Sequence, residues 1–141
     1  MFKTIGKPSY NVVMCHEGWK KLYQPIIDDI MQHDISAMCN EEKIGVMSVQ
    51  ASDGQMEIQL INDANASAQM HQRITNAEQL SLKMCEYCGN TSQVGTTMNF
   101  FYKTCCKSCW EKEILPKFPQ SIWKNYATNV HHKLDSKLII K

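Results

Sequence analysis

The sequence predicts an α+β protein in which two helices pack on a short antiparallel sheet, followed by a C-terminal lobe organised by cysteines. Three observations lead to this prediction. Apolar residues recur at helical spacing over residues 17–33, an Asp-Gly pair separates two segments of alternating polarity, and two CxxC pairs follow residue 84. The 141 residues are enough for one compact domain with a smaller lobe attached.

The first predicted helix runs from about Glu17 to His33, after an irregular start with a short strand at Tyr10 to Met14. Its apolar residues recur three and four positions apart, which is the spacing of one buried helix face. They are Trp19, Leu22, Tyr23, Ile26, Ile27, Ile30 and Met31. Pro25 removes one backbone hydrogen bond from this helix, so we expect a kink or a break there.

A β-hairpin is predicted next, with strands at Ile44 to Ala51 and Met56 to Ile61. Asp53-Gly54 joins them, and this dipeptide favours a type I′ turn because both of its central positions need a positive φ. In the second strand the apolar residues alternate with polar ones, so we expect one face to be buried. That face consists of Met56, Ile58 and Leu60.

A second helix is predicted from about Ala64 to Lys83, with Asn62 or Asp63 as its N-terminal cap. It leads directly into the first cysteine pair, so we expect the cysteine lobe to be rigidly attached. The predicted buried stripe comprises Ala66, Met70, Ile74, Ala77, either Leu80 or Ser81, and Met84.

Four cysteines in two CxxC pairs indicate a metal site. Cys85 and Cys88 form the first pair, Cys106 and Cys109 form the second, and seventeen residues separate the inner two. Two pairs at this spacing can close a tetrahedral thiolate site around one Zn²⁺ ion, which would be structural because no ligand position is left open. Gly89 follows the first pair, where a tight turn toward a metal often needs a positive φ.

The order of elements around these cysteines is typical of a treble-clef finger. A knuckle turn at the first pair is followed by a β-rich stretch from Thr96 to Thr104 and by a helix from Lys107, whose first turn would supply the last two ligands. We therefore expect residues 1–84 to form the α+β part, 85–116 the zinc finger and 117–141 an aromatic and basic extension.

Other interpretations of the cysteines fit less well. A rubredoxin-like iron site would favour Gly after both pairs, a disulfide framework suits a short secreted chain, and a redox CxxC needs a βαβ unit that the sequence does not contain. Cys105 leaves one alternative open, because it lies beside Cys106 and can in principle replace it as a ligand. The CxxC spacing to Cys109 favours Cys106, and Cys105 is then interpreted as a small buried side chain.

From the composition we expect a soluble cytoplasmic protein. It contains no apolar run of membrane-spanning length and no secretory signal at its start, and three of its seven cysteines stay unassigned, which suits a reducing compartment. Residues 1–80 contain six Lys and Arg against ten Asp and Glu, whereas residues 81–141 contain nine against four. This basic rear half suits an anionic partner, although an ordinary solvated lysine surface explains it equally well.

The cysteine segments also resemble a known group of proteins. The runs Cys85-Glu86-Tyr87-Cys88-Gly89, Ile74-Thr75-Asn76-Ala77-Glu78 and Tyr102 to Cys109, with an early Gly18-Trp19 helix, are similar to small phage and bacterial proteins of uncharacterised function. The resemblance covers about residues 16–110, and Cys105 stands where the pattern has Leu. Length and Lys/Ile/Asn-rich composition resemble early proteins of T-even phages that modulate mRNA metabolism. This resemblance implies a phage-encoded effector of host RNA metabolism or transcription and no catalytic residues.

Two function classes are indicated, neither of them enzymatic. The first is binding to a host RNA-processing or transcription protein through an exposed aromatic segment. Its candidate residues are Phe118, Ile122, Trp123 and Tyr126. The second is direct RNA binding, in which aromatic rings stack on bases and lysines contact phosphates. Its candidate residues are Phe101, Lys103, Lys107 and Lys112.

A nuclease of the HNH type is the less favoured third interpretation, although treble-clef scaffolds host such enzymes. Its general base and further metal ligands should lie near the finger, and residues 89–105 contain no His, Asp or Glu.

Overall fold

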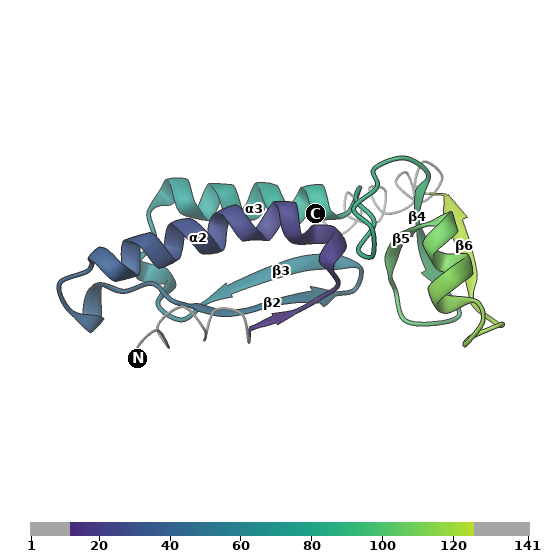
Figure 1. Ribbon diagram of the computed structural model, residues 1–141, viewed down its shortest axis with the longest axis horizontal. Coiled ribbons are helices and arrows are strands. Elements are labelled where there is room, and N and C mark those ends of the chain that lie inside the picture. The colour runs from purple at the N-terminus through teal and green to yellow at the C-terminus, as the bar shows by residue number, and fades with distance from the viewer. Residues whose placement is uncertain (1–11, 126–141) are drawn as a thin grey trace, which may run out of the picture.

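The computed structural model describes residues 12–125 and shows two lobes that lie next to each other along the long axis of the molecule (Figure 1). Residues 12–84 form the helical lobe and residues 85–125 form the cysteine lobe. Tyr126 and the first half of the strand predicted at Tyr10 to Met14 lie outside the described residues.

In the helical lobe, two helices cover one face of a three-stranded sheet (Figure 1). Strand order is β1-β2-β3, with β2 and β3 antiparallel and β1 parallel to β2. The parallel pair arises because α2 carries the chain back across the sheet between β1 and β2. The elements are β1 (Val13–Met14), η2 (Glu17–Trp19), α2 (Lys20–Ser36), η3 (Asn40–Glu42), β2 (Val46–Ser52), β3 (Gln55–Leu60), η4 (Asp63–Asn65) and α3 (Ala68–Ser81).

The predicted hairpin and its turn are confirmed. Asp53 and Gly54 have φ values of 53° and 83°, and Ser52 pairs with Gln55 across the two-residue loop. On β3, Met56 and Ile58 are buried against the helices, as their alternation predicts.

The helix α2 buries the predicted apolar stripe and continues through Pro25 without a break. Pro25 lies near the start of α2, where the missing N–H removes only the hydrogen bond to the carbonyl of Lys21. Packing of the buried face outweighs this loss. Buried along η2 and α2 are Trp19, Tyr23, Ile26, Ile27 and Ile30.

The start of α3 differs from the prediction. Ser67 caps this helix by accepting a hydrogen bond from the backbone N–H of Met70 at 3.0 Å, whereas Asn62 and Asp63 belong to the preceding turn. Near the end of α3, Ser81 is buried and Leu80 is 53% exposed. Ser81 is buried because its Oγ accepts the outward N–H of Met56 at 2.9 Å, which helps α3 to cover the free edge of β3.

The cysteine lobe contains a second three-stranded sheet, in the order β5-β4-β6 with both pairs antiparallel. Its elements are β4 (Val94–Met98), β5 (Thr104–Cys106), α4 (Lys107–Cys109), the π-helical turn η5 (Trp110–Ile114) and β6 (Ile122–Asn125). Strand β6 was not predicted, and it comes from the segment assigned to a separate extension. Gly95 makes this pairing possible, because a Cβ there would overlap the carbonyl oxygen of Lys124.

Each lobe has its own core, and the two cores divide between Met84 and Cys85. The first consists of aliphatic and aromatic residues from both helices and the hairpin. The second consists mainly of cysteines with Ile114, against which Trp110 and Trp123 pack. No helix within residues 12–125 combines the length and apolar character that a membrane span needs.

Candidate metal centre

The four predicted ligands lie together in the cysteine lobe. The Sγ atoms of Cys85, Cys88, Cys106 and Cys109 all lie within 4.8 Å of one another. Among the described residues this is the group of His, Cys, Asp and Glu side chains that is arranged to hold a metal ion. Three of the four are buried and Cys88 is exposed, so the site lies just beneath the surface.

The spacing of the thiols fits a tetrahedral zinc site. Zinc–sulfur bonds of about 2.3 Å in a tetrahedron require sulfur atoms about 3.8 Å apart. The Sγ atoms of Cys88 and Cys106, which come from different pairs, are 3.7 Å apart. With four thiols as donors, a soft or borderline metal such as Zn²⁺ suits the set better than a hard cation does. The cluster is therefore consistent with a single metal site.

A tight turn positions the first two thiols, and we call residues Cys85–Gly89 the knuckle. The N–H of Gly89 donates to the carbonyl of Cys85 at 2.9 Å, and the N–H of Cys88 points to the sulfur of Cys85 at 3.5 Å. Gly89 has φ = 80°, as predicted, which an L side chain rarely adopts.

A strand-to-helix junction positions the other two thiols. Cys106 ends β5 with extended backbone angles and stands at the N-terminal cap of α4, and Cys109 lies one turn further. This spacing turns both side chains toward the knuckle. Cys105 precedes Cys106 on the same strand, and successive strand residues face opposite sides. It is fully buried outside the four-thiol group, and burial raises the pKa of its thiol to about 12.

The electrostatics of the cluster favour a cation at its centre. Burial raises the pKa of Cys85 and Cys109, since it disfavours their thiolate forms. At Cys88 burial acts in the same direction, but hydrogen bonds from the backbone of Asn90 and from the neighbouring thiols outweigh it and lower the pKa. Four thiolates so close together repel one another unless a metal ion neutralises them.

The two cysteines of the helical lobe do not extend this site. Cys15 lies before α2 and Cys39 lies after it, so a helix of 17 residues separates them by about 25 Å. Cys39 is exposed, whereas burial, followed by the nearby Glu86 carboxylate, raises the pKa of Cys15 to about 11.

We expect this difference to appear in alkylation of the metal-loaded protein. At pH 8 iodoacetamide should modify the exposed Cys39 much faster than Cys15, because only the thiolate reacts and burial raises the pKa of Cys15. The reaction at Cys15 should accelerate as the pH rises toward 11. Peptide mass spectrometry measures both rates. Equal rates at pH 8 would contradict the burial of the Cys15 thiol relative to that of Cys39.

The four residues predicted to contact RNA occupy different environments. Phe101 is 74% exposed, and Lys107 and Lys112 are also exposed. Lys103 is not free, because its ammonium lies 3.4 Å from the carboxylate of Glu86 and 5.7 Å from the centre of the Tyr87 ring. Glu86 itself is 1% exposed, so this is a largely buried ion pair.

The predicted partner-binding residues also separate. Phe118 is 36% exposed and Ile122 is 45% exposed, but Trp123 packs on the cysteine core. The indole Nε1 of Trp123 donates to the carbonyl of Cys105 at 2.9 Å, so this side chain has a structural role. Tyr126 lies outside the described residues.

Phe101, predicted to contact RNA, and Phe118, predicted to bind a protein partner, lie on one surface because both rings contact Phe100. The rings of Phe100 and Phe101 have centroids 5.1 Å apart, and those of Phe100 and Phe118 have centroids 4.4 Å apart. Ile122 on β6 pairs with Met98 on β4, and Met98 lies two residues before Phe100 in the chain. We call Phe100, Phe101, Phe118 and Ile122 the aromatic surface.

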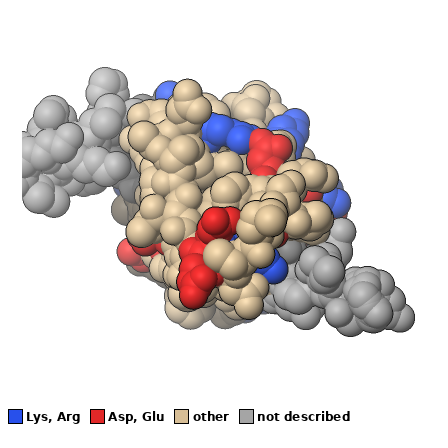
Figure 2. Space-filling view, turned by 90° about the vertical axis from the view of Figure 1, so that its left-hand side faces the viewer, with Lys and Arg blue, Asp and Glu red and all other residues tan. Residues whose placement is uncertain are grey.

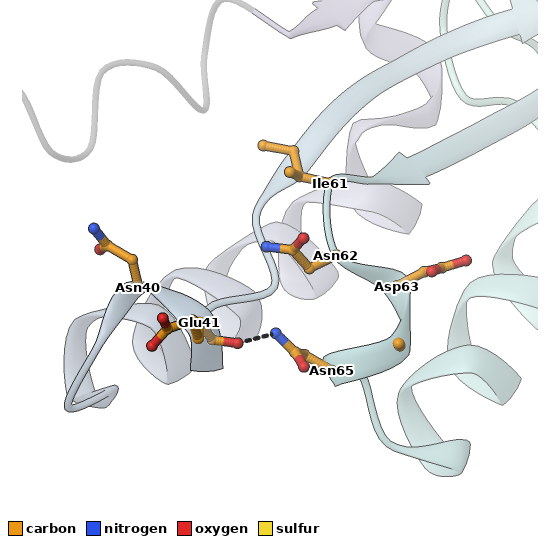
Figure 3. A pocket seen from close by; sticks show the side chains of 7 residues that line it. Asn40, Glu41, Ile61, Asn62, Asp63 and Asn65 are labelled. Carbon is orange, nitrogen blue, oxygen red and sulfur yellow. Dashed lines mark hydrogen bonds between the residues drawn. The ribbon is translucent and has the colours of Figure 1, made fainter.

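A depression at the far end of the helical lobe is a second feature on the surface, between η3 and η4 (Figure 3). Its polar groups tie loops together, since the Nδ2 of Asn65 donates to the carbonyls of Glu41 and Lys43 at 2.7 and 2.8 Å. The carboxylates of Glu41 and Asp63 point away from each other (Figure 3). Acidic and basic side chains are interspersed on this end of the molecule (Figure 2). The depression therefore shows no converging set of functional groups.

Sequence reasoning missed the residues that join the metal centre to the helical lobe. Gly18, Glu86 and Thr104 make these contacts, and only Glu86 carries a detectable signal, as a charged residue between two predicted ligands. Its side chain accepts a hydrogen bond from the N–H of His16 at 3.2 Å in addition to its pairing with Lys103.

Comparison of the chain with protein-family models, with curated proteins and with solved structures found no match.

Proposed function

We propose that this chain is a non-enzymatic binding protein in which a treble-clef finger with one structural Zn²⁺ presents the aromatic surface to a protein partner. The observation that carries the proposal is the convergence of Phe101 and Phe118 on Phe100 beside the metal centre. The sequence resemblance supports a phage-encoded effector in the host cytoplasm, with a host RNA-processing or transcription protein as the partner.

The donor set supports a structural role for the metal. Catalytic zinc sites keep one position for water or substrate, whereas four thiolates fill a tetrahedral shell. The order of knuckle, antiparallel strands and helix start around the thiols supports the treble-clef assignment. When bound, the metal would cross-link the knuckle to the start of α4 and supply no reactive group.

The character of the aromatic surface supports a macromolecular partner. Phe101 and Phe118 both expose apolar area next to Phe100, Ile122 is also exposed, and clustered aromatic residues of this kind are enriched where proteins bind one another. Aromatic rings with few rotatable bonds contribute contact area at low entropic cost.

The charges favour a protein partner over RNA. Lys103 is paired inside the lobe, and the exposed Lys107 and Lys112 alternate with exposed Glu111 and Glu113 along α4 and η5. This stretch is neutral overall, so it offers little of the positive field that phosphate binding needs.

The test is a pull-down from bacterial lysate, with and without RNase, using protein shown by native mass spectrometry to contain one zinc. We expect one host protein to be captured in both conditions. The double variant Phe101→Ala/Phe118→Ala should reduce capture at least about tenfold, since each lost aromatic anchor costs on the order of 1–2 kcal/mol. Leu80→Ala is the matched control, because Leu80 is a similarly exposed apolar residue on α3 of the other lobe.

Two outcomes would contradict the proposal. Capture that disappears with RNase, with RNA recovered from the untreated sample, would establish direct RNA binding instead. Capture that survives RNase but falls equally in the Leu80→Ala control would remove the aromatic surface from the interaction.

A further inference from the structure

The knuckle contacts the helical lobe as closely as it contacts its own lobe. The N–H of Gly18 donates to the carbonyl of Glu86 in the knuckle at 2.7 Å, and the indole Nε1 of Trp19 donates at 2.9 Å to the carbonyl of Met84, the residue directly before the knuckle. Both donors lie in η2, immediately before α2. The start of α2 is therefore docked on the backbone that carries Cys85 and Cys88.

This docking leaves no space between the two backbones. A Cβ at Gly18 would overlap the carbonyl oxygens of Cys85 and Glu86, and a Cβ at Gly89 would lie 2.9 Å from the carbonyl oxygen of Gly18. The two backbones fit together only while the knuckle keeps its tight turn, because that turn directs the carbonyl of Glu86 toward the N–H of Gly18.

The hairpin turn of the helical lobe meets the same region from another side. The Oγ1 of Thr104 donates to the carbonyl of Gly54 at 2.6 Å, and the N–H of Glu86 donates to the carbonyl of Thr104 at 3.0 Å. Thr104 lies on β5, two residues before Cys106. Each thiol pair thus lies in a segment that contacts the helical lobe.

We propose that metal binding by the four cysteines docks the start of α2 and the β2–β3 turn, so that occupancy of the metal centre is coupled to the order of the helical lobe. This inference rests on the proposed zinc site. Thiolate–metal bonds at Cys85 and Cys88 fix the knuckle, and a fixed knuckle presents the Glu86 carbonyl to Gly18 and the Glu86 carboxylate to His16. Coupling of this kind is reciprocal, so weaker docking lowers the affinity for zinc.

Amide hydrogen exchange of the full chain, zinc-loaded and after chelation, tests the direction from metal to lobe. We expect exchange to accelerate by about tenfold or more at residues 16–20 and 53–56, together with the knuckle. Amides at the other end of the hairpin, near Ile44 and Ile61, should change much less. Acceleration confined to residues 85–125 would overturn the inference.

Zinc affinity of paired glycine variants tests the reverse direction. Gly18→Ala should lower the affinity about tenfold or more in competition with a chromophoric chelator, because the added methyl group separates the backbones. Gly45→Ala is the matched control, since Gly45 has φ = 68° and faces the side chain of Ile61 at the other end of the hairpin. It should destabilise the helical lobe yet change zinc affinity less than about twofold. Equal effects of the two variants would overturn the coupling.

If Gly18→Ala does not fold, Trp19→Phe provides a second test, because it removes the hydrogen bond that holds the Met84 carbonyl, directly before the knuckle, to the start of α2 and keeps an aromatic ring in the core. We expect it to lower zinc affinity about two- to tenfold, and unchanged affinity would count against the coupling.

Native mass spectrometry of the unaltered protein distinguishes failure of the proposed zinc site from failure of the proposed coupling. Absence of zinc would overturn the metal centre and the coupling together, whereas bound zinc with uncoupled exchange would overturn the coupling alone.

Discussion

Replacing Cys106 with Ala is expected to abolish stoichiometric zinc binding and to unfold the cysteine lobe. The variant loses one of four ligands, and the apparent binding free energy of structural zinc sites, about 10–16 kcal/mol, is also the folding free energy of such lobes. The second core offers little in compensation, since cysteines and Ile114 make up its buried part. Native mass spectrometry and far-ultraviolet circular dichroism measure the two effects.

The neighbouring Cys105 provides the matched control for this experiment. Cys105→Ala removes a sulfur from the opposite face of the same strand, so zinc should remain bound and stability should fall by only about 1–2 kcal/mol. Loss of zinc in Cys105→Ala with retention in Cys106→Ala would reverse the ligand assignment. Retained structure of the cysteine lobe after complete chelation of the unaltered protein would contradict its dependence on metal.

Breaking the Lys103–Glu86 ion pair is expected to have the second-largest effect. Lys103→Met keeps the length of the side chain but leaves the Glu86 carboxylate, at 1% exposure, with the N–H of His16 as its one remaining hydrogen-bond partner among residues 12–125. Removing one member of a buried pair costs about 3–5 kcal/mol. Because the Lys103 side chain is 23% exposed, we expect a loss of about 2–4 kcal/mol in the free energy of unfolding.

Urea unfolding at a fixed zinc concentration measures this loss, since bound ligand shifts apparent stability. Lys107→Met is the matched control, because Lys107 is exposed and should change stability by less than about 0.5 kcal/mol. If Lys103 instead served RNA binding, Lys103→Met would keep its stability and lose affinity for RNA. Equal stability of the two variants would show that the ion pair makes no net contribution.

Local signals made several elements predictable from the sequence. The Asp53-Gly54 turn follows from the backbone freedom that a type I′ turn requires, and the buried face of α2 follows from the spacing of its apolar residues. Likewise, the CxxC spacing identified the four thiols that the fold brings together. In each case the determining interaction lies within a few residues along the chain, or depends on one chemical property shared by the ligands.

Features that depend on distant contacts were not predictable in this way. Strand β6 forms because Gly95 lets the backbone of Lys124 approach, and Ser81 rather than Leu80 is buried because its Oγ accepts the N–H of Met56. Ser67 was not predicted as the cap because Asn62 and Asp63 have equally suitable side chains, but these two residues belong to η4 and α3 starts only at Ala68.

The sequence by itself therefore determined the α+β class, the hairpin, the two helices and the identity of the four clustered thiols, since these depend on periodicity, turn chemistry and ligand spacing. The tertiary structure alone decided that Phe101 and Phe118 share one surface, that Lys103 is paired inside the lobe, and that Gly18 docks on the knuckle. The physical reason is that burial and charge pairing depend on which distant segments meet, and without a shared ligand chemistry like that of the thiols the sequence carries no local signal of such a contact.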